Sequence, residues 1–315
     1  MKILTQIPLK PLSFGQKESQ CETLFLTRGP FYHLCTPGDE SMTLFENEDD
    51  FRFAMNLFAL TTHLSTGINI ITFEVMGSHI HLIGEGESAA ARNWFGLFRK
   101  RLYRFYQSTG RVRNLDDFQA NIISIDNLPF LRNSIAYVNR NGYLVHLECT
   151  PFSYPWGANR YFFNPDAILR RDKLYGNLTY DEKRHLFRSN SIEYPSSHTL
   201  VDGYVSPANY CDLYLGERLF REARHYYSLI SRSVEGYQDI ARLLGDSLFC
   251  TDDELYLIMR QISKDKYGTS RLETLPPDRK RELAKIMHFD YKAGDQQIRR
   301  MLRVEERDIR ALFGK

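Results

Sequence analysis

The chain has 315 residues, 43% of them hydrophobic, so it can build a sizeable core and suits two or three domains. Its net charge of +2 excludes a strong overall field for nucleic acid, so any such attraction must come from local patches. Five scattered cysteines without a Cys-X-X-Cys pair argue against a zinc knuckle and favour a reducing compartment. No apolar run suits a signal peptide or a membrane span, so we expect a cytoplasmic protein.

The first half of the chain predicts alternating strands and helices. In order, we expect an irregular arm at 1–28, a strand at 30–36, a helix at 46–64, a strand pair at 68–86, a helix at 88–107 and a strand at 118–125. This order predicts an α+β fold, in which an antiparallel sheet carries helices on one face.

Two histidines in the strand pair are candidate metal ligands. Residues two apart in a strand share a face, so His79 and His81 should stand side by side while Ile80 turns into the core. Two imidazoles at this spacing can hold one divalent cation and leave room for a third ligand and a substrate oxygen. Such a pair also occurs by chance on sheets without a function.

A helix expected at 131–142 carries a candidate nucleophile. Tyr137 and Asn141 are four residues apart and share one helix face, and Gly142 suits a C-terminal cap. A tyrosine can attack phosphorus when a metal polarises the phosphate, and an amide oxygen one turn away can ligate that metal. On spacing alone, however, core packing of Tyr137 is the simpler interpretation.

Basic residues gather in the segment from 88 to 113, which holds seven of them and no acidic residue. We interpret the interleaved aromatic residues as a core face, but charge of this density suits a phosphate backbone. The candidate DNA-binding residues of this segment are Arg99, Lys100, Arg101, Arg104, Arg111 and Arg113.

The C-terminal region predicts a helical accessory region at 164–273 and three short helices at 274–315. The last two short helices, joined by a turn at Arg303, predict a helix-turn-helix. Residues 279–310 include ten basic and six acidic residues, and this excess of positive charge favours a DNA-binding role over a simple helical cap. If so, residues 305–313 form the recognition helix, with Arg307 and Arg310 as candidate contacts.

Four motifs, in matching order and spacing over residues 25–163, resemble the HUH single-tyrosine transposases, in particular the REP-associated tyrosine transposases. The motifs are Tyr32-His33-Leu34-Cys35-Thr36, Met76-Gly77-Ser78-His79-Ile80-His81-Leu82, Tyr137-Val138-Asn139-Arg140-Asn141 and Tyr154-Pro155-Trp156-Gly157-Ala158. The family usually has Pro-Asn where this chain has Gly77-Ser78, and a proline in place of Gly142. Loss of the asparagine at Ser78 would remove a hydrogen bond that orients a ligand.

The resemblance implies a ferredoxin-like or RRM-like nuclease domain over 1–163. In it, His79, His81 and Asn141 would hold one Mg²⁺ or Mn²⁺ ion. Tyr137 would attack a DNA phosphate to give a 5′-phosphotyrosine and a 3′-OH, followed by strand transfer. The expected partner is single-stranded or hairpin DNA, with no membrane and possibly a homodimer.

Two alternatives remain open from the sequence. One is a DNA-binding regulator without chemistry, which uses the same fold as a platform and the C-terminal helices to read sequence. The other is a replication initiator or relaxase with the same metal pair, although the Tyr-Pro-Trp motif speaks against it.

Overall fold

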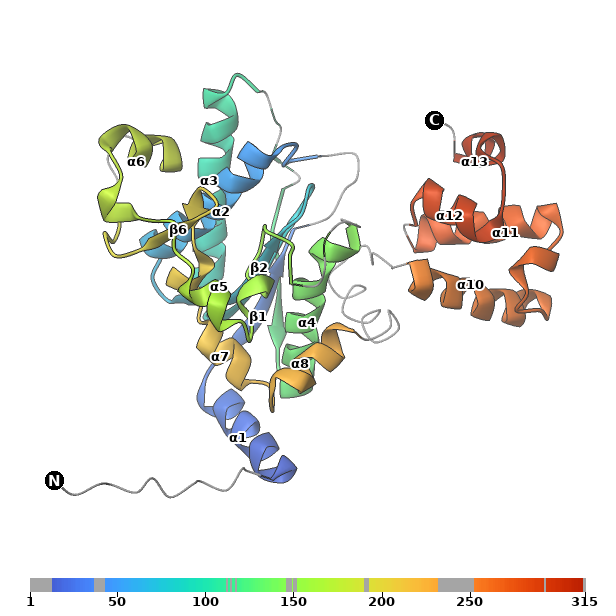
Figure 1. Cartoon of the computed structure of the whole chain (residues 1–315), viewed down its shortest axis with the longest axis horizontal. Coiled ribbons are helices and arrows are strands. Elements are labelled where there is room, and N and C mark those ends of the chain that lie inside the picture. The colour runs from blue at the N-terminus through green and yellow to red at the C-terminus, as the bar shows by residue number, and fades with distance from the viewer. Residues whose placement is uncertain are drawn as a thin grey trace.

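A computed structural model describes residues 13–36, 43–111, 113, 115–116, 118–145, 149, 152–189, 193–231, 252–291 and 293–313. The side chains of 143–145, 252–254, 296, 306 and 310 lie outside this description. In the first half of the chain the strands are β1 (Phe31–Cys35), β2 (Ile68–Val75), β3 (Ile80–Gly86) and β4 (Asn121–Ile125), and the helices are α1 (Phe14–Thr27), α2 (Glu48–Leu64), α3 (Ser88–Ser108) and α4 (Leu128–Val145). These described strands form one antiparallel sheet in the order β2-β3-β1-β4 (Figure 1).

The sheet separates two layers of helices. Successive strand residues point to opposite faces, and β2 shows both of them. Phe73 stacks on Phe58 of α2 with ring centroids 4.1 Å apart, and Phe58 also meets Phe98 of α3. On the other face, the hydroxyl of Thr72 donates a 2.5 Å hydrogen bond to Asn139 of α4. The predicted α+β class is confirmed, but the helices do not all lie on one face: α2 and α3 share one face of the sheet, and α4 covers the opposite one (Figure 1).

The prediction of an irregular arm before β1 is wrong for residues 14–27, which form α1. Ser13 and Gln16 make a capping box, in which the Ser13 N–H donates to Gln16 Oε1 over 2.9 Å and the Gln16 N–H donates to Ser13 Oγ over 3.4 Å. Only Cys21 of this helix is buried. Because this helix buries so little, the apolar residues in its sequence do not recur at a clear helical spacing, and the sequence pattern did not indicate a helix.

The prediction that Gly142 ends the tyrosine helix is also wrong, because α4 continues to Val145. Gly142 has a packing role instead. A Cβ atom at this position would lie 2.1 Å from Cδ1 of Tyr154, so the missing side chain lets the Tyr154 ring pack directly on α4. The Tyr154 hydroxyl donates a 2.7 Å hydrogen bond to the Val75 carbonyl, which ties this ring to β2 as well.

Residues 152–231 pack on the sheet and its helices through short elements. These are η1 (Asn159–Tyr161), α5 (Pro165–Leu169), β5 (Lys173–Leu174), η2 (Tyr175–Asn177), α6 (Tyr180–Phe187), β6 (Thr199–Val201), β7 (Tyr204–Val205), η3 (Pro207–Asn209), α7 (Leu213–Arg218) and α8 (Ala223–Ile230). Three of these elements are short strands, so the accessory region predicted at 164–273 is not helical throughout. Asp202 and Gly203, with φ of 53° and 82°, make a tight turn between β6 and β7, which favours a hairpin.

The described C-terminal residues build a hydrophobic core of their own. Their elements are α10 (Asp252–Tyr267), η5 (Leu272–Thr274), α11 (Pro277–Asp290), α12 (Asp295–Leu302) and α13 (Glu306–Phe313). Residues 232–251 of the predicted accessory region lie outside the described residues. The core includes Leu255 and Met259 as well as Ile298 and Ile309, so α10 belongs with the last three helices. The predicted division at 163/164 and 273/274 stays a prediction.

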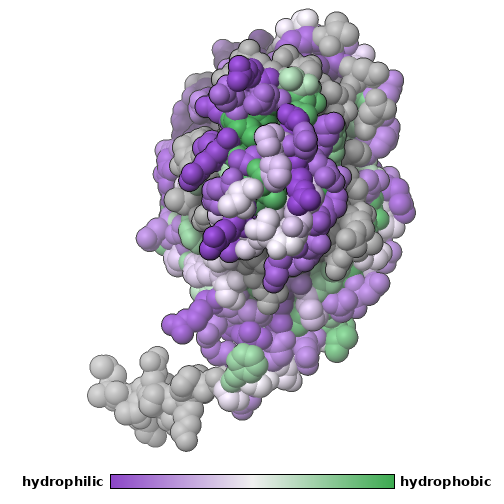
Figure 2. Space-filling model, turned by 90° about the vertical axis from the view of Figure 1, so that its right-hand side faces the viewer, coloured by the Kyte–Doolittle hydropathy of each residue, from purple (hydrophilic) through white to green (hydrophobic). Residues whose placement is uncertain are grey.

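One face of the molecule is shown in Figure 2, where hydrophilic side chains predominate and apolar ones appear in small, separate patches. None of the described helices is long and apolar enough to cross a lipid bilayer.

Candidate active site

The two predicted histidines lie side by side at the start of β3. The ring centroids of His79 and His81 are 4.9 Å apart, and the ring planes are nearly perpendicular. His81 lies opposite Cys35 of β1 and opposite Glu74 of β2, so all three project from the face that α4 covers. The strand thus brings both imidazoles to one face, as their spacing predicted.

A third histidine, His33 of β1, joins this pair. Its Nε2 atom lies 3.2 Å from Nδ1 of His81. His33 is two residues from Cys35, the cross-strand partner of His81, so the antiparallel register places the two imidazoles diagonally on one face. No role was predicted for His33. Its only sequence signal was its place in the strand motif at 32–36.

Ser78 hydrogen-bonds to the other histidine of the pair. Its hydroxyl lies 3.0 Å from Nδ1 of His79, so Ser78 gives this ring a polar partner where the sequence predicted that one would be lost. Both Nδ1 atoms of the pair are therefore held by protein groups, Ser78 for His79 and His33 for His81. Metal binding by these rings would use the Nε2 atoms, and such second partners orient metal-binding imidazoles.

Tyr137 reaches this cluster from α4. Its ring centroid lies 5.7 Å from that of His81 and 6.3 Å from that of His33. The structure thus brings the predicted nucleophile and the predicted metal ligands together. The Tyr137 side chain is 0% exposed, and the three histidines are at most 1% exposed. The whole cluster is enclosed, so a phosphate can reach the phenol only after a covering segment moves.

Asn141 lies one turn further along α4. Its side chain is buried, and its Nδ2 atom makes no hydrogen bond within the described residues. A buried carboxamide without a full set of partners suits a ligand that would supply one, and its nitrogen and oxygen can exchange places by a flip. Within the described residues, no three His, Cys, Asp or Glu side chains are placed to hold a metal ion. A metal site here would therefore need the Asn141 oxygen beside His79 and His81.

Glu74 of β2 links α4 to the neighbouring strand that carries His81, and the sequence analysis predicted no role for it. It is fully buried, and its Oε2 atom accepts a 2.9 Å hydrogen bond from the Gly142 N–H. Burial raises the pKa of Glu74 well above its usual range, and the Gly142 hydrogen bond opposes this rise. Because Glu74 pairs with His81 across the strands, this bond places the Asn141 turn of α4 above the histidines.

A buried hydrogen-bond chain fixes α4 against the rest of the domain. Beyond the Thr72 bond, Asn139 Nδ2 donates to the Tyr226 hydroxyl over 2.7 Å, and that hydroxyl donates to Asn159 Oδ1 over 2.6 Å. The chain runs from β2 through α4 to α8 and η1. Helix α8 therefore holds the helix that carries Tyr137, which gives part of the predicted accessory region a direct link to the site.

The structure gives two of the predicted DNA-binding arginines another use. Arg111 makes a two-pronged ion pair with the buried Asp50, at 2.6 and 2.7 Å, and its guanidinium lies over the rings of Phe105 and Tyr106. Arg113 pairs with Glu46. An acidic partner balances each charge, buried Asp50 for Arg111 and the exposed Glu46 for Arg113, so both arginines contribute less to a field outside the fold.

The remaining basic residues of α3 differ in exposure. Lys100 and Arg104 are exposed, whereas Arg99 and Arg101 are partly buried. Arg99 donates to the Leu115 carbonyl and pairs with Asp116. Burial and then the nearby Arg104 charge lower the pKa of Arg101. Lys100 and Arg104 are thus the strongest candidates on this helix for contacts with phosphate.

The C-terminal candidates lie on α13. Arg307 is exposed, and its Nε atom pairs with Glu305 over 2.9 Å. The side chain of Arg310 lies outside the described residues. Arg303, in the left-handed conformation with φ of 51°, ends α12 and makes the turn into α13. The predicted succession of helix, short turn and helix is present, while its role in reading DNA stays a prediction.

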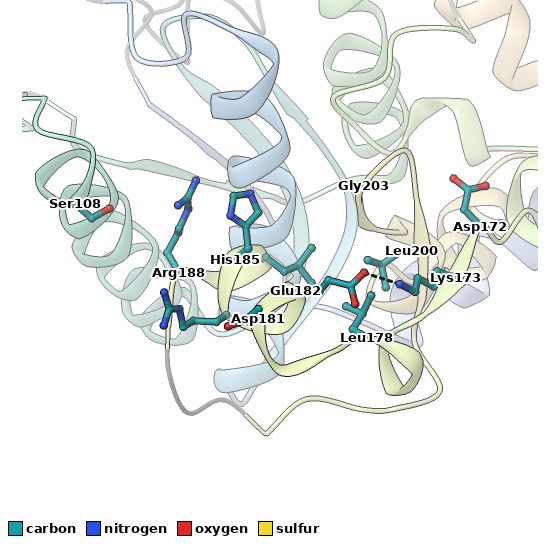
Figure 3. A pocket seen from close by; sticks show the side chains of 12 residues that line it. Ser108, Asp172, Lys173, Leu178, Asp181, Glu182, His185, Arg188, Leu200 and Gly203 are labelled. Atoms are coloured by element: carbon teal, nitrogen blue, oxygen red, sulfur yellow. Dashed lines mark hydrogen bonds and ion pairs between the residues drawn. The ribbon is translucent and has the colours of Figure 1, made fainter.

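A cavity of about 1130 Å³ lies apart from the histidines, between the end of α3 and the α6–β6 segment (Figure 3). Its charged lining residues are Lys173, Arg184, Arg188, Asp172, Asp181 and Glu182. Lys173 and Glu182 pair across 2.6 Å, and the signs balance overall. A lining of this kind does not favour a phosphate backbone.

Comparison with protein-family models and with curated proteins finds no match. A solved structure, described as a REP-associated tyrosine transposase bound to a REP hairpin, is similar with 11% sequence identity and a TM-score of 0.33. The similarity covers 56% of this chain and 94% of that one.

Proposed function

We propose that this protein is a metal-dependent DNA strand transferase that uses Tyr137 as its nucleophile. One observation carries the proposal: the Tyr137 ring on α4 lies 5.7 Å from His81, which stands beside His79 and hydrogen-bonds to His33. A phenol, paired imidazoles and a buried carboxamide one helical turn away can supply the nucleophile and the metal ligands for tyrosine-mediated phosphoryl transfer.

The residues would divide the work as follows. His79, His81 and Asn141 would hold one Mg²⁺ or Mn²⁺ ion, which when bound polarises the scissile phosphate. His33 and Ser78 orient the two imidazoles through their Nδ1 atoms. The Tyr137 oxygen loses its proton and attacks phosphorus. A Tyr–O–P bond forms, the bond to the leaving 3′ oxygen breaks, and that oxygen takes up a proton.

The product of this step is a 5′-phosphotyrosine and a free 3′-OH. The covalent link conserves the energy of the phosphodiester, so a second 3′-OH can reverse the step without ATP. Resemblance of the four sequence motifs to the REP-associated tyrosine transposases supports single-stranded or hairpin DNA as the substrate, since an unpaired strand gives access to its phosphates. A homodimeric active unit is part of the same proposal.

We further propose that α12 and α13 read DNA as a helix-turn-helix, with α13 in the groove. The exposed Arg307 supports this role, as does the excess of basic residues in this region. Arg307 to Ala should weaken binding to a cognate site more than binding to an unrelated duplex. An equal loss on both would indicate contact with phosphate alone.

A second candidate function is favoured by the enclosure of the site. Because Tyr137 is 0% exposed, its ring also fits a purely structural role in the core. The protein would then be a DNA-binding regulator without chemistry. In that case binding to DNA would be tight and salt-sensitive, and His79→Ala would leave it unchanged.

The experiment is a test for a covalent adduct. Purified protein is incubated with Mn²⁺ and labelled single-stranded DNA from its own genetic locus, with and without a hairpin, and resolved under denaturing conditions. We expect a slowly migrating adduct that Tyr137→Phe and His81→Ala abolish. Tyr175→Phe, a matched change in a separate apolar cluster, should retain it. No adduct from any substrate, or an unchanged adduct with Tyr137→Phe, would leave only the regulator.

A further inference from the structure

The outer face of α3 carries a hollow that the proposed chemistry does not use. It has a volume of about 560 Å³ and is lined by Gly96, Arg99, Lys100, Tyr103, Gln107, Arg113, Leu115 and Asp116. Residues 96, 100, 103 and 107 recur at helical spacing, so they form one continuous strip. Since α3 lies on the sheet face opposite α4, this strip is remote from Tyr137.

Gly96 leaves the hollow open. It is exposed in the middle of α3, where glycine is an unfavourable residue. Close packing does not explain it, because a Cβ atom there would meet nothing within 4 Å. A glycine with neither a packing nor a backbone requirement is consistent with a need for space above the helix. The space is bordered by Lys100 and Tyr103, one and two turns further along the same strip.

Tyr103 presents an aromatic surface in this hollow. It is 47% exposed, although the sequence predicted that the aromatic residues of α3 all belong to a core face. Its hydroxyl accepts a 3.0 Å hydrogen bond from Gln107 Nε2, which restrains the ring. A restrained, exposed ring loses little entropy when a flat ligand stacks on it.

The charge around the ring is positive. Helix α3 contains five basic residues and no acidic one. Lys100 and Arg104 flank Tyr103 and are exposed, and Asp116, the acidic residue of the lining, pairs with Arg99. An aromatic platform between exposed cationic side chains is complementary to a nucleotide, whose base stacks while its phosphates meet the cations.

We propose that the α3 hollow binds single-stranded DNA, with one unpaired base stacked on Tyr103 above Gly96 and the adjoining phosphates on Lys100 and Arg104. This inference rests on the proposed function only for the choice of DNA as the partner. It adds a second contact region for the strand, separate from the histidines. It also gives a role to these two exposed cations, whereas Arg111 and Arg113 pair with the acidic side chains of Asp50 and Glu46.

The test is the equilibrium binding of a fluorescein-labelled oligothymidine, followed by anisotropy, to full-length protein in the Tyr137→Phe background. Tyr103→Ala should weaken binding roughly 5- to 150-fold, the range for loss of one stacked base, and Tyr103→Phe should retain most of it. Gly96→Leu should also weaken binding, because its side chain fills the hollow. Lys100→Ala and Arg104→Ala should each lower the salt slope by about 0.7.

The matched control is Tyr214→Ala, which removes another exposed tyrosine, 69% exposed and beside Arg218 on α7. It should bind oligothymidine like the parent. Wild-type affinity in Tyr103→Ala, or an equal loss on a blunt duplex without unpaired bases, would overturn the proposal. Thermal midpoints of Tyr103→Ala and Gly96→Leu that are not below that of the parent would show that both fold.

The two proposals fail in different ways. Loss of adduct formation with intact, Tyr103-dependent oligothymidine binding would refute strand transfer and leave the α3 site standing. Normal adduct formation with oligothymidine binding that does not depend on Tyr103 would refute the α3 site and leave the strand-transfer proposal standing.

Discussion

His33 and His81 lie on adjacent antiparallel strands with Nε2 of the first 3.2 Å from Nδ1 of the second. One ring must donate and the other accept, so this contact selects the tautomer of His81. If His33 donates from Nε2, His81 accepts at Nδ1 and carries its proton on Nε2; the reverse assignment leaves Nε2 of His81 as an acceptor able to bind a metal. Metal binding therefore requires that the Nδ1–H of His81 donates to His33.

Removal of His33 should weaken metal binding at the proposed site rather than abolish adduct formation. We expect His33→Ala to raise the Mn²⁺ concentration for half-maximal adduct formation by about 10- to 100-fold, as for other partners of metal-binding histidines. His33→Gln places an amide oxygen near the position of Nε2 and should restore part of the loss. His185→Ala, an exposed histidine beside the α6 cavity, serves as the control. Identical Mn²⁺ titrations of His33→Ala and the wild type would refute this role.

The Tyr226 hydroxyl should stabilise the domain by holding α4 and η1 together. Tyr226→Phe would leave Asn139 Nδ2 and Asn159 Oδ1 without this partner inside the core, at a cost of about 1–3 kcal/mol. Urea unfolding followed by tryptophan fluorescence measures it, because both tryptophans, Trp94 and Trp156, lie in this part of the chain. Tyr227→Phe, the same change one residue along, should shift the midpoint far less. Equal urea midpoints for the two variants would argue against a stabilising role of the Tyr226 hydrogen bonds.

Two glycines of the helices should respond to alanine with opposite signs. Gly142→Ala places a Cβ atom 2.1 Å from Tyr154 Cδ1, and the displaced ring should cost about 1–3 kcal/mol of stability. Gly96→Ala meets no neighbouring atom and should raise stability by about 0.5–1 kcal/mol through helix propensity. The same urea experiment compares them. A stabilised Gly142→Ala would mean that Tyr154 does not pack on α4 as described.

Glu85 should make stability depend on pH in acid. Burial alone would raise the pKa of Glu85, but hydrogen bonds from Arg28, Asn69 and the Gly29 N–H outweigh it and lower the pKa to about 2. A folded pKa below the ordinary value of 4.5 means that the ionised form stabilises the fold. This contribution is fully present above pH 4.5 and is lost as pH falls toward about 2.

Glu85→Gln should therefore lower stability at neutral pH by about 1–3 kcal/mol and flatten the fall in stability between pH 4.5 and about 2. Urea midpoints across this range give the comparison. Glu87→Gln, two residues along at the start of α3 without a side-chain cap bond, is the control. A Glu85→Gln curve parallel to that of the wild type would contradict the assignment.

Local patterns were sufficient for much of the fold. The alternation around His79 and His81 predicted their common face, and the spacing of Tyr137 and Asn141 predicted their common helix face. Relationships across long distances were not accessible in this way. The diagonal contact of His33 with His81 depends on the β1–β3 register, and the Glu74 bond to Gly142 depends on how α4 crosses the sheet.

Charge counts over a segment have the same weakness. The excess of basic residues at 88–113 pointed to DNA, but a count does not identify partners elsewhere in the chain. Arg111 meets Asp50, a residue 61 positions away, inside the domain. Only exposure in the folded chain separates Lys100 and Arg104 from Arg111, because all three have the same formal charge.

The enclosure of Tyr137 and the three histidines has a consequence for selectivity. A closed site and an open one are two populations, and a ligand shifts them only by the difference between its affinities for the two. A DNA strand that binds the closed and open forms equally well would leave the Tyr137 phenol inaccessible, however tightly it bound. On the proposed function, discrimination among DNA molecules would then take place before any bond is broken, in the opening equilibrium, and variants that loosen α8 against α4 would cleave DNA less selectively.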